Sequence, residues 1–267
     1  MTVKLVTKEK IAETSSKGNQ EKWYDKETDK WYKLDRFGYE ALSETLISKL
    51  LERSNIEKDT PFTFVRYEME KIRAHGRERT GCSSQNFSEG YSIITVNHLL
   101  GRHLGSPLKD KLESLTSDKK RIEYLAEKTK EVTGLEYFPQ YLTLLFEIDA
   151  MFLNDDRHLN NIAVLEKDGK YDYCPIFDNG AGLLSDTQMS PMDIEPKGLI
   201  RSLTARPFGT TFNRQKNTAE SLYGKQLVMP KLTKKEILKE LEPLIEYYPE
   251  RDRGLIGDRV VESILRK

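Results

Sequence analysis

The chain of 267 residues has room for one large domain or one two-lobed unit. Lys+Arg and Asp+Glu balance at 43 residues each, which excludes a global charge that recruits nucleic acid or an anionic membrane. No stretch approaches the roughly 20 apolar residues that span a bilayer, and the N-terminus lacks the apolar core of a signal peptide. We therefore expect a cytoplasmic protein that binds neither nucleic acid nor membrane directly, and later export by a route without such a signal stays open.

The first 35 residues show a β pattern. A mixed opening strand is expected over 3–11, and two aromatic-rich strands, 23–24 and 31–34, are joined by the polar turn 25–29, which predicts a hairpin. The small and polar residues of 14–20 suit either an ordinary turn or a loop whose backbone N–H groups hold an anion.

Lys33 lies on the second strand of this hairpin, where a lysine usually faces solvent. Residues 38–53 follow as an amphipathic helix, because leucines recur at every fourth position. Glu40 and Glu44 lie one turn apart on a neighbouring face of that helix. We favour Glu44 as the partner that holds Lys33 extended, with Glu40 as the alternative. The simplest interpretation is that both carboxylates are solvated and pair with nothing.

The next part of the chain changes from β to helical patterns. Residues 61–69 alternate like a strand, and 71–90 are expected to form a loop or a short hairpin without assigned chemistry. From about 92 to 153 the pattern is helical, and 139–153 is apolar nearly all round, as is typical of a buried central helix. That helix ends at a polar turn, so a rigid element would carry whatever site the turn forms.

The polar turn and the segment after it carry the chemistry. Asp156 can accept a proton from a hydroxyl, and Asn161 and Asp178 offer the amide and carboxylate oxygens that Mg²⁺ binds beside phosphate and water. Residues 162–165 and 171–177 predict a β-hairpin with its turn at Asp168-Gly169. This hairpin would bring Asn161 and Asp178, at its two outer ends, together.

The end of the chain is less specific. After Asp178 we expect an activation-like segment to about 220, whose scattered basic and aromatic residues suit a solvated loop better than a binding surface for an acidic peptide, RNA or lipid. Residues 233–247 and 254–266 predict two amphipathic helices.

The motif Asp-Arg-His-x-x-Asn at 156–161, followed by Asp178, resembles the catalytic and metal-binding loops of phosphatidylinositol 3/4-kinases. With Asn154 and Asp155 it also resembles the HipA-like bacterial serine/threonine kinases, which share that fold. The length favours a compact member of the HipA-like group. The resemblance implies an α+β, two-lobed protein-kinase-like (PI3/4-kinase-like) fold, with a β-rich N-terminal lobe over 1–97 and a helical C-terminal lobe over 98–267.

The same resemblance implies that ATP and Mg²⁺ lie between the lobes. Gly18-x-Gln20-x-Lys22 resembles the HipA-like phosphate loop, so Gly18 and Gln20 are expected at the phosphates together with Lys33. In the resembled families the histidine of the Asp-Arg-His loop lies beside the transferred phosphate, which makes His158 a catalytic candidate ahead of Arg157. Backbone groups of the segment after 61 would form the hinge that meets adenine, at Arg66, Tyr67, Glu68 and Met69.

The resemblance also implies the acceptor and the partner. A HipA-like kinase of the toxin or effector type phosphorylates a protein Ser or Thr and can phosphorylate itself near the phosphate loop, where Ser15 or Ser16 is the candidate. Such kinases commonly have a DNA-binding antitoxin partner, although this chain shows no helix-turn-helix of its own. Two alternatives stay open: a lipid or small-molecule kinase of the phosphatidylinositol-kinase type, and a pseudokinase module that binds nucleotide without turnover.

Overall fold

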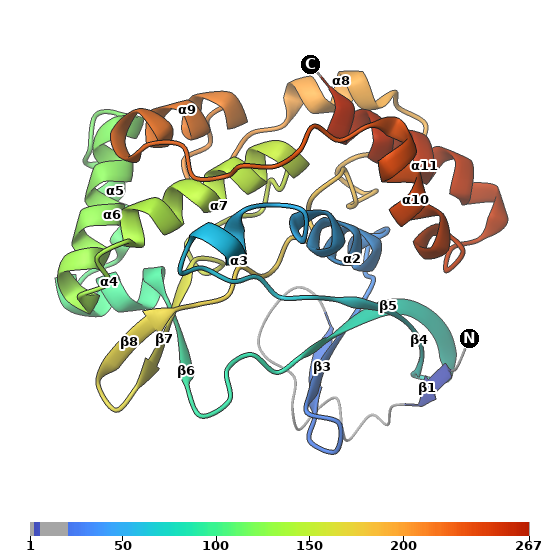
Figure 1. Cartoon of the computed structure of the whole chain (residues 1–267), viewed down its shortest axis with the longest axis horizontal. Coiled ribbons are helices and arrows are strands. Elements are labelled where there is room, and N and C mark those ends of the chain that lie inside the picture. Colours follow the sequence, from blue (N-terminus) through green and yellow to red (C-terminus); the bar gives the residue numbers. More distant parts are fainter. Residues whose placement is uncertain (1–2, 6–20, 267) are drawn as a thin grey trace.

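The computed structural model describes residues 3–5 and 21–266. This part of the chain forms two β-sheets and a group of helices that lies mainly on one side of them (Figure 1). The first sheet comes from the N-terminal part of the chain, and the second contains the hairpin that follows Asn161. The structure therefore has a β-sheet N-terminal region and a mainly helical C-terminal part, as the sequence predicts.

The N-terminal sheet has five strands: β1 (Val3–Leu5), β2 (Lys22–Asp25), β3 (Lys30–Leu34), β4 (Glu68–Ala74) and β5 (Arg77–Gln85). They lie in the order β1-β4-β5-β3-β2, with β1 parallel to β4 and the other neighbours antiparallel. The predicted aromatic hairpin is β2–β3. Of the predicted opening strand over 3–11, the described strand covers Val3–Leu5, and residues 6–11 lie outside the described part of the chain.

Helix α2 (Glu40–Leu51) confirms the helix predicted over 38–53 and packs against β4, β5 and α10. Ten of its 12 residues are buried, because it is covered by the sheet on one side and by helices on the other (Figure 1). Its N-terminus is held by Asp35, whose carboxylate accepts the Ala41 N–H at 2.6 Å and the Tyr248 hydroxyl at 2.7 Å. The short helix α3 (Ile56–Asp59) follows.

The second sheet contains β6 (Ser92–Thr95), β7 (Ala163–Lys167) and β8 (Lys170–Tyr173), all antiparallel. The β7–β8 hairpin is confirmed, and its turn residues Asp168 and Gly169 both have positive φ, at 51° and 77°, as a tight Asp-Gly turn requires. Strand β6 precedes the helices and pairs with β7, although the sequence pattern from 92 onward favours helix.

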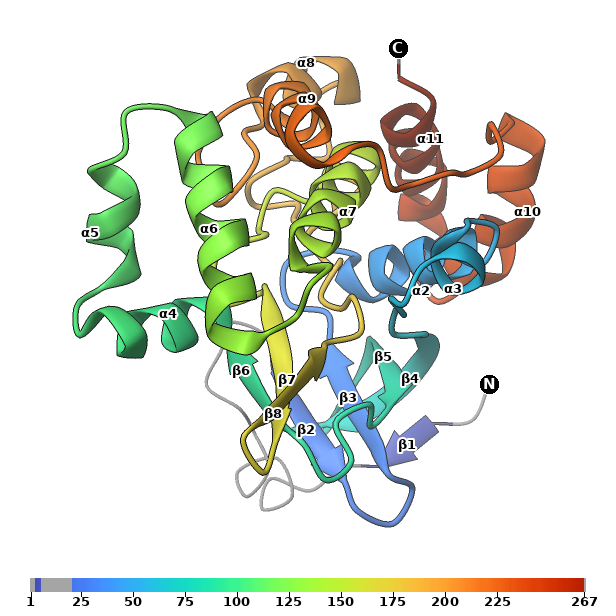
Figure 2. The same cartoon turned by 60° about the vertical axis from the view of Figure 1, so that its left-hand side comes forward.

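Two groups of helices complete the fold (Figure 2). Helix α7 is buried over 13 of its 15 residues and ends where the polar turn begins, as predicted. The predicted C-terminal pair is α10 and α11, and α10 starts with a capping box between Thr233 and Glu236. The bounds are α4 (Val96–Leu104), α5 (Leu108–Glu113), α6 (Asp118–Thr133), α7 (Phe138–Phe152), α8 (Pro196–Ser202), α9 (Phe212–Tyr223), α10 (Lys234–Ile245) and α11 (Glu250–Leu265).

Three predicted segments differ from the structure. The expected strand 61–69 is mostly irregular, and 71–90, predicted as a loop or short hairpin, contains most of the two central strands β4 and β5. The expected solvated loop to 220 contains α8 and α9. The connection between the sheets runs over 86–91, so the change from one sheet to the other falls before the predicted boundary at 97.

Candidate active site

The register of the β2–β3 hairpin places two lysines on one face of the first sheet. Trp23 and Tyr32 are directly opposed, buried, and stacked with ring centroids 5.5 Å apart. Because side chains alternate along a strand, burial of this pair turns the neighbouring opposed pair, Lys22 and Lys33, to the other face. Both lysines line a cavity of about 690 Å³.

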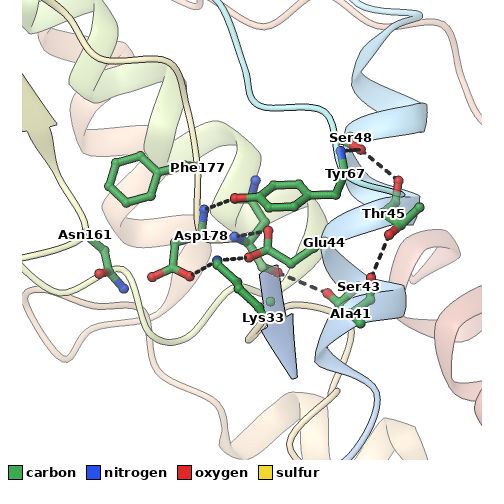
Figure 3. Close-up of polar contacts among 12 residues, drawn as sticks. Lys33, Ala41, Ser43, Glu44, Thr45, Ser48, Tyr67, Asn161, Phe177 and Asp178 are labelled. Atoms are coloured by element: carbon green, nitrogen blue, oxygen red, sulfur yellow. Dashed lines mark hydrogen bonds and ion pairs between the residues drawn. The ribbon is translucent and has the colours of Figure 1, made fainter. Parts of the chain in front are cut away.

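Lys33 lies between two carboxylates (Figure 3). Its Nζ is 2.5 Å from Oε1 of Glu44 on α2 and 2.7 Å from Oδ1 of Asp178. The predicted preference for Glu44 is therefore right as a contact, whereas Glu40 accepts the N–H groups of Phe37 and Gly38. The second carboxylate oxygen of Glu44 accepts the Asn179 N–H at 2.8 Å, so α2 is tied to the chain directly after Asp178.

The charges of this cluster fix its protonation states. Burial alone would lower the pKa of Lys33, but the carboxylates of Asp178 and Glu44 raise it well above its ordinary value. Burial alone would raise the pKa of Asp178, but the adjacent Lys33 lowers it to about 2. Asp178 is therefore ionised at neutral pH. Lys22 has a lowered pKa, because burial and the charge of Lys33 outweigh the attraction of Asp178 and Glu44.

The turn after α7 supplies the opposite wall of the cavity. The helix ends at Leu153, which has the left-handed φ of 59°. Asn154 then accepts the Asp156 N–H at 3.2 Å and donates to the carbonyl of Asp178 at 3.3 Å. The Asn161 amide nitrogen donates to the carbonyl of Asp156 at 3.0 Å, which leaves its oxygen as the group that can bind a metal ion.

Arg157 holds both parts of this wall together. It is completely buried and pairs with Asp149 of α7, with an Nη2–Oδ1 distance of 3.1 Å. It also donates to the carbonyls of Asn161 at 3.2 Å and Phe177 at 2.7 Å, and to Oδ1 of Asn179 at 2.7 Å. The sequence gives Arg157 less weight than His158, yet Arg157 fixes the backbone next to both predicted metal ligands. Its place within the Asp-Arg-His motif is the available signal.

The cavity brings together five of the predicted site residues. Lys33, Asp156, His158, Asn161 and Asp178 all line it, and Figure 3 shows the Asn161 amide beside the Asp178 carboxylate. Partial burial raises the pKa of Asp156, while the charge of His158 opposes this effect. His158 Nε2 lies 3.9 Å from the Asp156 carboxylate.

The residues present fit a nucleotide with a divalent metal ion. An ionised carboxylate and an amide oxygen on one side of a cavity are enough for Mg²⁺, which keeps most of its other positions for water and phosphate. Lys22 and Lys33, which line the same cavity, match the negative charge of phosphates. The structure thus adds Lys22 to the predicted set, and its signal is its place in Gly18-x-Gln20-x-Lys22. Gly18 and Gln20 themselves lie outside the described residues.

The predicted hinge residues do not line the cavity. Arg66 is exposed and pairs with Glu57 at 2.7 Å and with Glu52 at 3.1 Å, and Glu68 pairs with Lys30 at 2.9 Å. Met69 is buried opposite Cys82 in the sheet. Tyr67 does reach the site from behind, because its ring lies 5.2 Å from Lys33 Nζ and its hydroxyl accepts the Asp178 N–H at 3.5 Å.

The structure places the connection between the sheets after β5 instead. Within residues 86–91, Phe87 packs against Phe177, with ring centroids 5.7 Å apart. Ile93 and Thr95 of β6 line the cavity together with Phe177. The adenine contact predicted at 66–69 stays a prediction, and the connection over 86–95 is the part of the chain that crosses beside the cavity.

Kinase-like folds share a characteristic arrangement of these groups. A lysine on a β-strand pairs with a glutamate on the following helix, and an aspartate suited to metal binding lines the same cavity as an Asp-x-x-x-x-Asn turn. Among solved structures, the chain is similar to the Helicobacter pylori proinflammatory kinase CtkA, with a TM-score of 0.54 and 13% identity over 94% of this chain and 93% of that chain. This likeness shows that the chain shares the fold of that kinase.

A second solved structure is a chain of the HipA, HipB and operator DNA complex of the Shewanella oneidensis MR-1 toxin–antitoxin system. The TM-score is 0.48 and the identity 13%, over 94% of this chain and 64% of that chain. No protein-family model matches the sequence, and no curated protein sequence matches it.

Proposed function

We propose that this protein is an ATP- and Mg²⁺-dependent phosphotransferase, of the HipA-like protein serine/threonine kinase type within the PI3/4-kinase-like folds. One observation carries the proposal: Lys33 is held by Glu44 and Asp178 at 2.5 and 2.7 Å, and it lines a cavity that Asp156, Asn161 and Asp178 line as well. Asp178 and Glu44 keep Lys33 charged against the effect of burial, and a positioned lysine that faces a phosphate cavity stabilises transferred charge.

Each wall has a separate task in this proposal. Lys33 and Lys22 bind the phosphates, with Gly18 and Gln20 of the predicted phosphate loop, and Glu44 keeps Lys33 extended toward the cavity. Asn161 and Asp178 would hold Mg²⁺, which when bound neutralises phosphate charge. Because Arg157 fixes the carbonyls of Asn161 and Phe177, the two ligands keep a constant separation.

The transfer step uses Asp156 and His158. The acceptor hydroxyl oxygen forms a bond to the γ-phosphorus of ATP while the bond from that phosphorus to the β,γ-bridging oxygen breaks, so ADP leaves. The hydroxyl proton passes to the Asp156 carboxylate, whose pKa is raised by partial burial. His158 lines the cavity beside Asp156, where a protonated imidazole would stabilise the transferred phosphoryl group.

Transfer of labelled γ-phosphate from ATP tests the proposal. The wild-type chain, Asp156→Asn and Lys33→Met are compared with Mg²⁺, using a mixture of Ser- and Thr-containing peptides as acceptors. We expect each variant to lose about 10²- to 10⁴-fold in rate, the usual range for a general base or a charge-stabilising group. Lys197→Met, in a groove beside α11, is the control and should keep the wild-type rate.

The outcomes separate the alternatives. Phosphorylated peptide in the wild type alone supports the protein kinase. Label in phosphoinositide vesicles, or in a small molecule, would show that the protein is a phosphotransferase whose acceptor is a lipid or a small molecule and not a protein. Intact ATP binding with no transfer to any acceptor would overturn the enzyme and leave a pseudokinase module.

Autophosphorylation and an antitoxin partner stay predictions from the family resemblance. Ser15 and Ser16 lie outside the described residues. Phosphopeptide mapping after incubation with ATP would contradict these two predicted autophosphorylation sites if the label appeared only elsewhere. Copurification from the native host would test the partner. No helix in the described part of the chain has the length and apolar character to cross a membrane.

A further inference from the structure

A second cavity, of about 230 Å³, adjoins the candidate active site. Asp156, Ala181 and Asp186 line both cavities, whereas Lys33 and Asp178 line only the larger one. The two cavities therefore meet at Asp156, the residue to which the proposed function assigns the acceptor proton. A group in the smaller cavity would reach Asp156 without entering the phosphate side.

The outer wall of the smaller cavity is a turn at 186–190. Oδ1 of Asp186 accepts the N–H groups of Gln188 at 2.9 Å and Met189 at 3.2 Å, and the Ser190 N–H donates to the Asp186 carbonyl at 2.8 Å. Its inner end pairs with the loop before α2, where Gly38 bridges to Asp186. A Cβ on Gly38 would come within 2.0 Å of the Ser185 carbonyl oxygen, so this close approach requires glycine.

Arg259 of α11 holds the other end of that turn. Its side chain is buried, with the residue 2% exposed, and it donates to the carbonyls of Ser190 at 2.8 Å and Pro191 at 2.9 Å. It also lies 3.1 Å from the sulfur of Met192. Among the described residues, no carboxylate pairs with Arg259. The two terminal nitrogens of this buried guanidinium donate to consecutive carbonyls, and these charge-assisted hydrogen bonds restrain the backbone there.

We propose that the 230 Å³ cavity receives the hydroxyl-bearing side chain of the protein acceptor, and that Arg259 is a positioning residue that fixes its outer wall. The proposal rests on the proposed function. The proposal gives helix α11 a role in acceptor binding, although Arg259 contacts neither the lysines expected to bind phosphate nor the residues expected to bind the metal ion. The wall is held from α11 and from the loop before α2, so both anchors are needed to keep Met189 and Ser190 in place.

The ATP side should be insensitive to Arg259. The contacts of Lys33, Glu44 and Asp178 come from β3, α2 and the backbone at Asn179, and none of them involves α11. Loss of the Arg259 hydrogen bonds is therefore expected to change acceptor binding and leave nucleotide binding unchanged. A merely structural role would instead lower the fraction of folded protein, which lowers the apparent kcat without a selective change in the acceptor KM.

Steady-state kinetics of Arg259→Gln and Arg259→Lys test this proposal, with a peptide library that has a fixed central Ser or Thr as the acceptor probe. The matched control is Arg253→Gln, which removes an arginine on the same helix that also donates to two carbonyls, of Tyr248 at 3.0 Å and Glu246 at 3.1 Å, away from the 186–190 turn. Hydrogen exchange of the backbone amides is measured for the same proteins.

For Arg259→Gln we expect the acceptor KM to rise about tenfold or more, because the charge-assisted hydrogen bonds to Ser190 and Pro191 are lost, with the KM for ATP unchanged. Arg259→Lys should recover part of the loss. Faster exchange should appear at 186–192 in Arg259→Gln and not in Arg253→Gln. A rise in both KM values, or an equal effect of Arg253→Gln, would overturn the positioning role.

The failure of the proposed function is distinguishable from failure of this inference. Absence of transfer in the wild-type protein contradicts the proposed function and the acceptor role of the cavity together. The hydrogen-exchange comparison still decides the role of Arg259, because unchanged exchange at 186–192 in a folded Arg259→Gln protein would show that Arg259 does not fix the wall.

Discussion

The two walls of the large cavity are built in different ways. The wall that carries Asp156 and Asn161 follows directly from the end of α7, and Arg157 holds it from within by buried hydrogen bonds. The wall that carries Lys33 is assembled from separate elements, since Lys33 pairs with Glu44, 11 residues away, and with Asp178, 145 residues away. The first wall is anchored in the folded core by the buried Arg157, and the second depends on ion pairs between separate elements at the edge of a cavity.

This difference separates stability from activity. Arg157 is completely buried and pairs with the buried Asp149 and Asn179, so the fold depends on it. The Lys33 and Asp178 side chains are 12% and 29% exposed, so their contact can yield to a nucleotide and a metal ion without unfolding the protein. Substitutions in the two walls should therefore have different consequences.

The largest expected effect is that of Arg157→Met. It leaves Asp149 buried without its partner, together with the carbonyls of Phe177 and Asn161. Breaking a buried ion pair by removal of one partner costs about 3–5 kcal/mol, and urea unfolding followed by circular dichroism would measure it. Arg251→Met, at a side chain that is 86% exposed, is the control and should change the free energy of unfolding little. A loss below about 1 kcal/mol for Arg157→Met would contradict the contrast between the walls.

A smaller effect is expected from the pH dependence of Asp178. Its pKa in the folded chain is about 2, below its ordinary value of 3.8, because Lys33 favours the carboxylate. The stabilisation is therefore fully present above about pH 4 and is lost as the pH falls through 2. It amounts to about 2 kcal/mol, and Asp178→Asn lacks it. The difference in unfolding free energy between the two proteins should shrink between pH 5 and 2, and a constant difference would show that Lys33 does not hold Asp178.

The smallest effect is expected at Arg66. Its ion pairs with Glu52 and Glu57 are exposed, so Arg66→Gln should change the free energy of unfolding by less than about 1 kcal/mol. The affinity of the Arg66→Gln protein for ATP should equal that of the wild type, because Arg66 does not line the cavity. A titration of both proteins with a fluorescent ATP analogue measures this. Tenfold weaker binding of the analogue by Arg66→Gln would support an adenine contact at 66–69 and would contradict this expectation.

The fold was predictable where the pattern was local. The alternation of buried aromatic and polar residues in 23–34 specifies the β2–β3 hairpin, and the leucine repeat specifies α2. Residues 71–90 were not recognisable as central strands, because 77–85 are rich in polar and small residues such as Ser83 and Ser84, which are buried by α2 and the sheet. The alternating apolar pattern of 61–69 predicts a strand, but this segment packs between α2 and Ile176 with one isolated bridge.

The sequence by itself determined the chemical groups of the candidate site. Asp156, Asn161 and Asp178 are close in the chain around one hairpin, so spacing alone brings them to one cavity. Only the tertiary structure decided which glutamate pairs with Lys33, and that Lys22 lines the same cavity. It also decided where the chain crosses beside the cavity, and that Arg157 and Arg259 hold the backbone around it. The physical reason is that these contacts join elements far apart in the chain, and their geometry depends on how the sheet, α2 and α11 pack together.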